Sequence, residues 1–385
     1  MKRSKKNNRW KKQLISLTML AILIPFSAKI LSETVPIVGD AAGKAAVISA
    51  GLALPEGGRT LFQEEIDQSP DEDTITPEDP IPSEGEAAPA SETNLITDAD
   101  IPPTSGITQE EIDQYPNNDG AVVRKTYTAG STDDYINISG NAYVRNMTNL
   151  PNQTVIDAVH SPPAFTITPG TSEPQVLIMH THTTESYALS DNDYYDINYP
   201  SRNLDATRNV VRVGDEITKQ LEAAGIGVIH DTTVHDYPSY NGSYDRSKQT
   251  VETILAQYPS IKVVLDIHRD AIETNDGTRY APVANIDGRN AAQIMIISGC
   301  DDGTMDYPNY LQNLAFASVL EQQIESDYPG LTRPISFKYK YYNQSLTTGS
   351  LLIEVGSNSN SLDEAIYSGY LLGKSLAKTL QGLTG

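Results

Sequence analysis

Short apolar runs alternate with longer amphipathic stretches from about residue 173 to the end of the chain. The apolar runs predict strands at 175–179, 226–229, 262–267, 293–298, 333–339 and 350–355. Helical periodicity predicts helices at 205–224, 245–257, 307–328 and 361–380. Gly225 is expected to end the first of these helices, and Ser361 with Glu364 to cap the last one. Strands that alternate with helices predict an α/β fold, with a mainly parallel sheet covered by helices on both faces.

The segment before this region has a different pattern. Short alternating runs such as 122–127 and 142–145 are separated by turn formers. This pattern predicts a small β-rich preface, so we place domain boundaries at residues 121–170 for the preface and 171–385 for the main α/β domain.

The first 34 residues predict a membrane anchor. Basic residues crowd positions 2–12 without an acidic one, and positions 14–28 are almost wholly apolar. An uncleaved anchor or a cleaved signal peptide both fit this pattern, and we favour the anchor. In either case the positive-inside rule places the rest of the chain outside the cytoplasm, at the cell membrane.

Residues 35–120 are expected to connect the anchor to the folded part. Positions 35–54 are small and weakly apolar, and positions 55–120 are acidic and rich in proline, with Arg59 as the one basic residue. Such a composition predicts a disordered, extended linker. The hexapeptide QEEIDQ occurs at 63–68 and again at 109–114. It is either a chance repeat in an acidic segment or a docking motif for a partner.

Composition narrows the function classes. The chain of 385 residues has a formal net charge of −22, which argues against nucleic acid as a partner because phosphates repel an acidic surface. The single cysteine, Cys300, excludes an intrachain disulfide and a thiolate zinc cluster. The 21 tyrosines include loop residues near the predicted strand ends, such as Tyr240, where their amphipathic rings suit peptide or glycan strands or simply pack.

Three of the predicted strands end in side chains that bind metals. The first is followed by His180, His182 and Glu185, another ends at His268, and the last contains Glu354. Because the carboxyl ends of parallel strands meet at one edge, these side chains are expected to converge there. Two imidazoles and a carboxylate leave Zn²⁺ an open position for water, so we predict His182, Glu185 and His268 as ligands. Glu354 is the predicted general base.

Several neighbours have two interpretations. Asp205 is an alternative to Glu185 as the acidic ligand, although we prefer Glu185. His180 is expected on the same side of its strand as His182, as a contact of substrate or of a ligand. Asp266 either orients a ligand imidazole or is a solvated charge. Arg269 either stabilises a developing oxyanion as a catalytic group or pairs with Asp270.

Four runs together resemble the sporulation stage II protein P family of endospore-forming bacteria. They are HTHTTES at 180–186, HDTTVHDYPSYNGS at 230–243, DIHRDA at 266–271 and LIEVGSN at 352–358. The resemblance covers roughly residue 122 to the end. By it, His182 and His268 are ligands, Glu354 is catalytic, and Asn358 is a contact of substrate or of a ligand. Related zinc amidases take their acidic ligand from the first helix, which favours Asp205, whereas zinc carboxypeptidases use His-x-x-Glu, which favours Glu185.

This resemblance implies a peptidoglycan hydrolase of forespore engulfment. It implies a zinc-dependent N-acetylmuramoyl-L-alanine amidase with endopeptidase activity, acting in a complex with sporulation stage II proteins D and M. The residues alone predict a membrane-tethered metal hydrolase that faces the cell wall. Two other hypotheses stay open: a zinc peptidase that cuts crosslinks only, and a wall-binding scaffold without catalysis.

Overall fold

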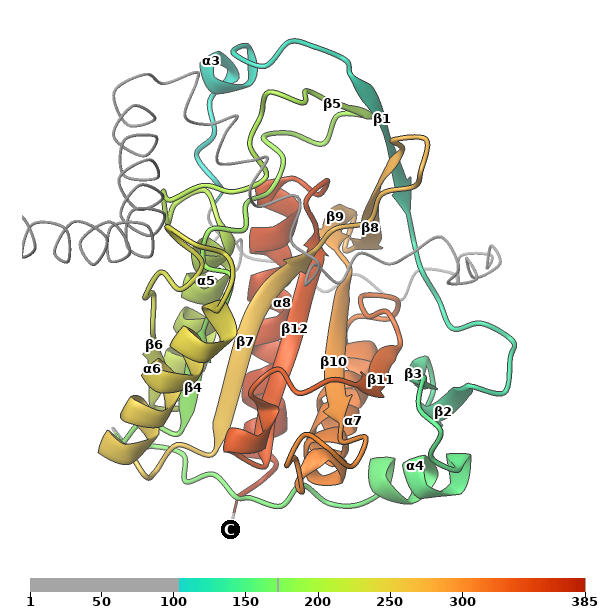
Figure 1. Ribbon diagram of the computed structural model, residues 1–385, viewed down its shortest axis with the longest axis vertical. Helices are drawn as coiled ribbons and strands as arrows, with labels where there is room; N and C mark the ends of the chain where they lie inside the picture. The colour runs from blue at the N-terminus through green and yellow to red at the C-terminus, as the bar shows by residue number, and fades with distance from the viewer. Residues whose placement is uncertain (1–103, 172, 385) are drawn as a thin grey trace, which may run out of the picture. The chain divides into compact units, whose positions relative to one another are not determined.

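The computed structural model describes residues 104–171 and 173–384 (Figure 1). The predicted anchor, most of the linker and the first QEEIDQ copy lie outside the described residues. Within the described part, none of the helices has both the length and the apolar character needed to cross a bilayer.

The core of the fold is an eight-stranded sheet with the order β2-β3-β11-β10-β12-β7-β4-β6. Its strands are β2 (Tyr135–Ser139), β3 (Ala142–Asn146), β4 (Val176–Met179), β6 (Val228–His230), β7 (Val263–Asp270), β10 (Ile294–Cys300), β11 (Ile335–Tyr339) and β12 (Gly349–Ser357). The strands β6, β4, β7 and β12 run parallel to one another, as predicted. The direction reverses at β10, which pairs antiparallel with β12, so the whole sheet is mixed. The chain passes from β11 to β12 through a short loop with the 3-10 turn η2 (Gln344–Leu346) and no crossover helix, which lets β12 return in the opposite direction.

Helices cover both faces of this sheet. On one face, α5 (Val210–Ala223), α7 (Tyr310–Asp327) and α8 (Leu362–Gln381) pack against the apolar side chains of the strands (Figure 1). On the other face, Val251 of α6 (Ser243–Gln257) packs with Leu177, Met179 and Val264. Alternation along β7 explains the division, since Val263 and Leu265 belong to the larger core and Val264 to the smaller one.

Local signals set several element boundaries as predicted. Ser361 accepts a hydrogen bond from the backbone of Glu364 and forms the expected capping box of α8. Gly225 ends the α5 segment with φ +74°, a conformation in which glycine avoids a steric cost. The predicted start of this helix at Asp205 is wrong, because the chain forms a turn there and Asn209 caps α5 instead. That turn is held by the Asp205 carboxylate itself, which accepts bonds from Thr207.

A second, four-stranded sheet with the order β5-β1-β8-β9 stands beside the carboxyl ends of β7 and β12 (Figure 1). It consists of β1 (Gly120–Lys125), β5 (Tyr194–Tyr195), β8 (Arg279–Ile286) and β9 (Arg289–Ala292). The strands β1 and β3 confirm the alternating runs at 122–127 and 142–145. They join different sheets, since β1 pairs with β8 while β3 extends the main sheet beside β11. The hydrophobic pattern of the sequence did not predict β8, β9 or the helix α4 (Asn152–Val159).

The short helix α3 (Gln109–Ile112) is formed by the first four residues of the second QEEIDQ copy. Thr108 and Glu111 form a capping box, and Glu111 pairs with Arg208 at 2.8 Å. This copy therefore lies against the folded domain rather than extending as a free linker.

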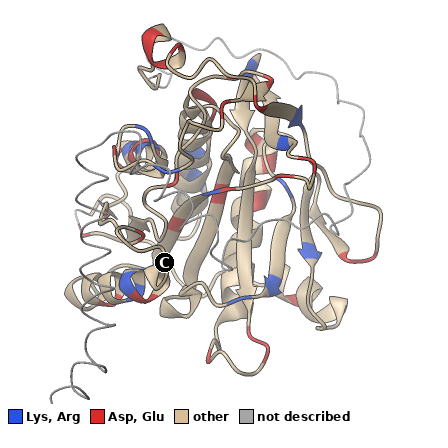
Figure 2. Cartoon of the chain, turned by 45° about the horizontal axis from the view of Figure 1, so that its top comes forward, with Lys and Arg blue, Asp and Glu red and all other residues tan. Residues whose placement is uncertain are grey.

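Charged groups are buried within this fold. Acidic positions, red in Figure 2, occur in the strands of the main sheet as well as in loops. In α7, Glu321 is fully buried and accepts one hydrogen bond, from the Tyr143 backbone N–H at 3.2 Å. Its Oε2 has no partner among the described residues. Burial, reinforced by Glu325 one turn away, raises the pKa of Glu321 well above its ordinary value.

We expect Glu321→Gln to stabilise the protein at alkaline pH. A carboxyl whose folded pKa is raised binds more protons in the folded than in the unfolded state, so its contribution to stability is lost as pH rises. Glutamine mimics the protonated carboxyl and removes this loss. The advantage of the variant should be absent below about pH 4 and then grow by at most about 1.4 kcal/mol per pH unit.

Urea unfolding of both proteins between pH 4 and 9 measures this difference. Glu222→Gln on the exposed face of α5 is the control, for which no such pH-dependent gain is expected. A constant difference between wild type and Glu321→Gln across the range would show that Glu321 is ionised in the folded protein.

Candidate active site

Alternation along two neighbouring strands places polar side chains on the α6 face of the sheet. On β7, Asp266 and His268 follow Val264 at intervals of two, and on β12, Glu354 follows Leu352 in the same way. The two strands pair in parallel with His268 directly beside Glu354. The predicted convergence of these strand ends is therefore found in the structure.

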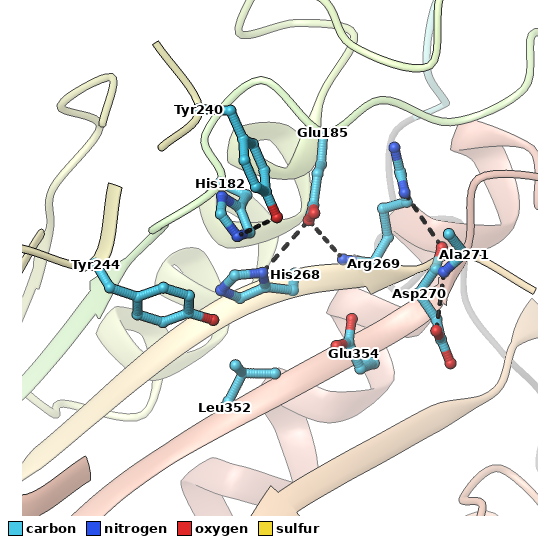
Figure 3. Close-up of a pocket in the computed structure, with 10 residues that line it drawn as sticks. All are labelled: His182, Glu185, Tyr240, Tyr244, His268, Arg269, Asp270, Ala271, Leu352 and Glu354. Carbon is cyan, nitrogen blue, oxygen red and sulfur yellow. Dashed lines mark hydrogen bonds and ion pairs between the residues drawn. The ribbon is translucent and has the colours of Figure 1, made fainter. Parts of the chain in front are cut away.

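A small pocket of about 40 Å³ lies at this point (Figure 3). A cavity needs about 10–15 Å³ to hold one water molecule, so this pocket has room for an ion or a few water molecules. Its lining contains five predicted site residues and five others: His182, Glu185, His268, Arg269, Glu354, Tyr240, Tyr244, Asp270, Ala271 and Leu352. All three predicted zinc ligands thus face one pocket together with the predicted catalytic glutamate.

The two histidines of the pocket meet edge to face, with ring centroids 5.1 Å apart. His182 stacks on Tyr240 at a centroid distance of 4.4 Å, and its Nε2 lies 3.0 Å from the Tyr240 hydroxyl. Its Nδ1 lies 3.4 Å from the Ser243 hydroxyl. Burial lowers the pKa of His182 well below its ordinary value, so its imidazole is neutral and able to act as a ligand.

His268 is held by a carboxylate behind it. Its Nε2 lies 2.8 Å from Asp266 Oδ1, close but without the angle of a hydrogen bond. Asp266 also accepts bonds from the backbone N–H and hydroxyl of Thr181, and only 5% of its surface is exposed. The alternative that Asp266 is a solvated charge is therefore wrong, and its position is that of a carboxylate orienting an imidazole.

Glu185 closes the pocket from the opposite side. Its Oε2 lies 3.5 Å from His268 Nδ1 and accepts the backbone N–H of Arg269 at 3.1 Å, while Oε1 lies 3.8 Å from Arg202. Burial alone would raise the pKa of Glu185, but the neighbouring His268 and Arg269 outweigh it and hold that pKa well below its usual range. Glu185 is therefore an ionised carboxylate.

Glu354 has the opposite character. It is 7% exposed, and its Oε2 has no hydrogen-bond partner among the described residues. Burial, together with the negative charges of Asp270 and Glu185, raises the pKa of Glu354 to about 8. A carboxyl with a pKa near neutrality and one unpaired oxygen is suited to take up and release a proton.

Arg269 contributes mainly its backbone to the pocket. Its guanidinium donates to the carbonyls of Ser186, Ser201 and Asp270, and the Asp270 carboxylate pairs with Arg333 at 2.8 Å instead. The expected ion pair between Arg269 and Asp270 is therefore not formed. Asn358 is half-buried beside the pocket, where its backbone N–H donates to the Asp270 carbonyl.

His180 points away from the pocket, against expectation. The strand β4 ends at Met179 and the chain turns over Thr181–Thr184, so residues 180 and 182 no longer share a side. His180 Nδ1 bonds the Ile267 carbonyl at 2.9 Å, and its Nε2 faces His230 Nε2 at 2.9 Å. His230 in turn lies 3.1 Å from Asp215 of α5. Burial lowers the pKa of His180 to about 3, so this residue is a neutral link between β4 and β7.

Asp205 does not reach the pocket. It is exposed in the turn before α5 and is absent from the pocket lining. Of the two candidates for the acidic ligand, only Glu185 lies with the two histidines.

Three other residues of the site carry only weak signals in the sequence. Tyr240 was visible only as one of many loop tyrosines, and Tyr244, whose ring meets His182 edge-on at 5.5 Å, looked like an ordinary helix residue. Asp270 was noted only as a partner for Arg269. Tyr240 enters the site on the loop at 231–242, Tyr244 on the first turn of α6 and Asp270 at the end of β7.

An α/β fold with paired histidines and carboxylates buried at the strand ends defines the class of this protein, one with a hydrolase-like site. Residues 84–377 match the family model described as stage II sporulation protein P. The chain therefore belongs to the stage II sporulation protein P family.

A relative with that name, from Bacillus subtilis (strain 168), is 32% identical over 200 residues. The match covers 49% of this chain and 47% of the relative, so the chain matches about half the length of that protein.

Two solved structures are reported for comparison. The N-acetylmuramoyl-L-alanine amidase AmiC2 of Nostoc punctiforme is 13% identical, with 55% of this chain and 98% of that chain covered and a TM-score of 0.34. The CwlD amidase from Clostridioides difficile, in complex with the GerS lipoprotein, is 12% identical, with 54% and 99% covered and a TM-score of 0.34. TM-scores at this level support no conclusion about fold or activity.

We expect Gly214→Ala to destabilise the protein by about 1–3 kcal/mol through the histidine pair behind the pocket. A Cβ at position 214 would lie 2.5 Å from His230 Nε2 and 2.9 Å from His180 Nε2. Alanine normally stabilises a helix by about 1 kcal/mol relative to glycine. A loss of stability in Gly214→Ala would therefore be due to the steric conflict. Urea unfolding measures it, with Glu222→Ala on the exposed face of the same helix as the control, expected within about 0.5 kcal/mol of wild type. Equal stability of Gly214→Ala and wild type would show that the pair has room to move.

Proposed function

We propose that this protein is a zinc-dependent peptidoglycan hydrolase that cleaves the amide between muramic acid and L-alanine, and that it also cuts peptide crosslinks. One observation carries the proposal: His182, Glu185, His268 and Glu354 come from three separate strand ends and line one buried pocket. Membership of the stage II sporulation protein P family supports peptidoglycan as the substrate, through the remodelling role that the resemblance implies.

The donor set fits zinc chemically. Two imidazole nitrogens and an ionised carboxylate are the ligands of many catalytic zinc sites. Burial alone would lower the pKa of His268, but Asp266 and Glu185 outweigh it and raise that pKa well above its ordinary value, so a metal ion would have to displace a proton from this ring. Zn–N bonds of about 2.0–2.1 Å place two ligand nitrogens within roughly 4 Å of each other, which ring centroids at 5.1 Å allow. Among residues 104–171 and 173–384, no three metal-binding side chains already surround one point. Each donor is instead bonded to the protein, His182 to Tyr240 and Glu185 to the Arg269 backbone.

A bound Zn²⁺ would polarise the scissile carbonyl and lower the pKa of a water molecule toward neutrality. Glu354 is the residue that would transfer the proton. When Glu354 is ionised, its unpaired Oε2 accepts a proton from the attacking water and then donates it to the nitrogen of L-alanine as the C–N bond breaks. Asp266 keeps the His268 ring in place during this exchange, because it lies against the nitrogen on the far side of the ring.

We also propose that the protein acts at the cell membrane. The basic, then apolar N-terminus would anchor it, with the catalytic domain outside the cytoplasm, and sporulation stage II proteins D and M would be its partners. Recovery of the full chain in the salt-washed membrane fraction, and its release only by detergent, tests the anchor. Recovery in the soluble fraction would contradict it.

We expect Glu354→Gln to lower the rate of hydrolysis of purified sacculi by about 10²–10⁴-fold while zinc stays bound. Glutamine keeps the shape of the side chain and removes the proton exchange. Mass spectrometry of the released muropeptides identifies the bond, because an amidase yields stem peptides with a free L-alanine amine. Only crosslink products would indicate a peptidase, and sacculi bound but uncut by wild type would indicate a scaffold.

Metal content of variants tests the ligands. We expect Glu185→Gln to reduce bound zinc strongly, because the variant removes the anionic ligand, whereas Asp205→Asn should bind as much zinc as wild type. Metal analysis after dialysis against a weak chelator gives the ratio for each protein. Zinc loss in Asp205→Asn with normal zinc in Glu185→Gln would reverse the assignment.

A further inference from the structure

We propose that the Tyr240 hydroxyl competes with the metal for His182 Nε2, so that metal binding must displace this tyrosine. The inference rests on the zinc site of the proposed function and concerns what regulates its occupancy. It starts from the 3.0 Å contact between the Tyr240 hydroxyl and His182 Nε2, the shorter of the two hydroxyl contacts of that imidazole (Figure 3).

The position of the hydroxyl suits a competitor. The hydroxyl lies 3.0 Å from Nε2, the nitrogen whose lone pair a metal ion would use, and it approaches this nitrogen from the stacked tyrosine ring. Tyr240 lines the pocket together with Glu185 and His268, so its hydroxyl lies among the three donors rather than behind one of them. By contrast, the partner of His268, Asp266, lies against its Nε2, on the ring edge opposite the nitrogen that faces Glu185.

Tyr240 is held in this place from several sides. Its ring stacks on His182 at 4.4 Å and the Arg202 guanidinium carbon lies 4.7 Å from its centroid. The side chain is only 6% exposed. The stacking and the cation–π contact stabilise this position of the Tyr240 side chain beyond the contribution of the single hydrogen bond.

The loop that carries Tyr240 is fixed by Arg246 of α6. The Arg246 guanidinium donates to the carbonyls of His235, Ser239 and Asn241, which flank Tyr240 on both sides. Asp236 anchors the same loop to Thr184 and Arg202. The contact of the hydroxyl with His182 is therefore built into the loop, and opening it requires the tyrosine to leave a packed position.

Two contacts of Arg202 connect the acidic donor Glu185 with the loop that carries Tyr240. Arg202 bonds Asp236 at 3.0 Å and lies 3.8 Å from Glu185, so one guanidinium touches the loop, the tyrosine and the acidic donor. An ion that draws Glu185 toward itself would also loosen the group that packs on Tyr240. Metal entry and movement of the tyrosine are thus linked through the same side chains.

Zinc affinity of the full chain tests the proposal. Competition with a fluorescent chelator should show that Tyr240→Phe binds Zn²⁺ about two- to tenfold more tightly than wild type, the worth of one hydrogen bond. Tyr258→Phe is the matched control, because this tyrosine follows the C-terminal end of α6 outside the pocket lining, so the loss of its hydroxyl should leave the affinity unchanged. Thermal unfolding of each metal-free variant establishes that it is folded.

A second measurement reads the displacement directly. Zinc should change the near-ultraviolet absorbance of tyrosine in wild type and in Tyr258→Phe, and this change should be absent in Tyr240→Phe. Equal or weaker zinc binding by Tyr240→Phe would overturn the competitor role and leave the proposed function intact. If neither wild type nor Tyr240→Phe binds zinc, both the inference and the zinc-dependent function fail.

Discussion

The parallel pairing of β7 with β12 is the constraint on which the site depends. It places His268 beside Glu354 on the face of the sheet opposite the larger core. Two polar side chains at the centre of a sheet lose hydration that costs several kcal/mol unless the protein replaces it. The surrounding structure replaces it with paired groups: Asp266 for His268, and the pair of Asp270 with Arg333 next to Glu354. The site is possible because partner groups compensate for the hydration that these polar side chains lose when the strands are buried.

The two glutamates of the pocket show how position separates chemical roles. Glu185 and Glu354 face the same small space, yet their pKa values move in opposite directions. Glu185 leaves its strand on a turn and meets a backbone N–H and cationic neighbours, which favour the ionised form. Glu354 sits within β12, near other carboxylates and with an unpaired oxygen, which favours the protonated form. A carboxylate that stays ionised and one that exchanges a proton are the two components that hydrolysis at a metal requires.

Hydrogen bonds from charged side chains also fix the loops over the strand ends. Arg246 binds three carbonyls of the segment that carries Tyr240, and Asp236 ties this segment to the turn after β4. Behind the pocket, His180 joins the end of β4 to the Ile267 carbonyl of β7. Such bonds fix the backbone segments that carry the donors, which reduces the ordering that binding would otherwise require.

The sequence by itself determined the α/β class, most helices and strands of residues 173–384, and the side chains that meet in the pocket from separate strand ends. These features depend on local periodicity, capping signals and the rule that parallel strand ends meet at one edge. The tertiary structure decided the rest. Asp205 lies outside the pocket because the chain turns before α5, and His180 points away from the pocket because the chain leaves the extended conformation directly after β4. The reversal at β10, the second sheet and the contact of Tyr240 with His182 join residues far apart in the chain, and no local pattern encodes such pairings.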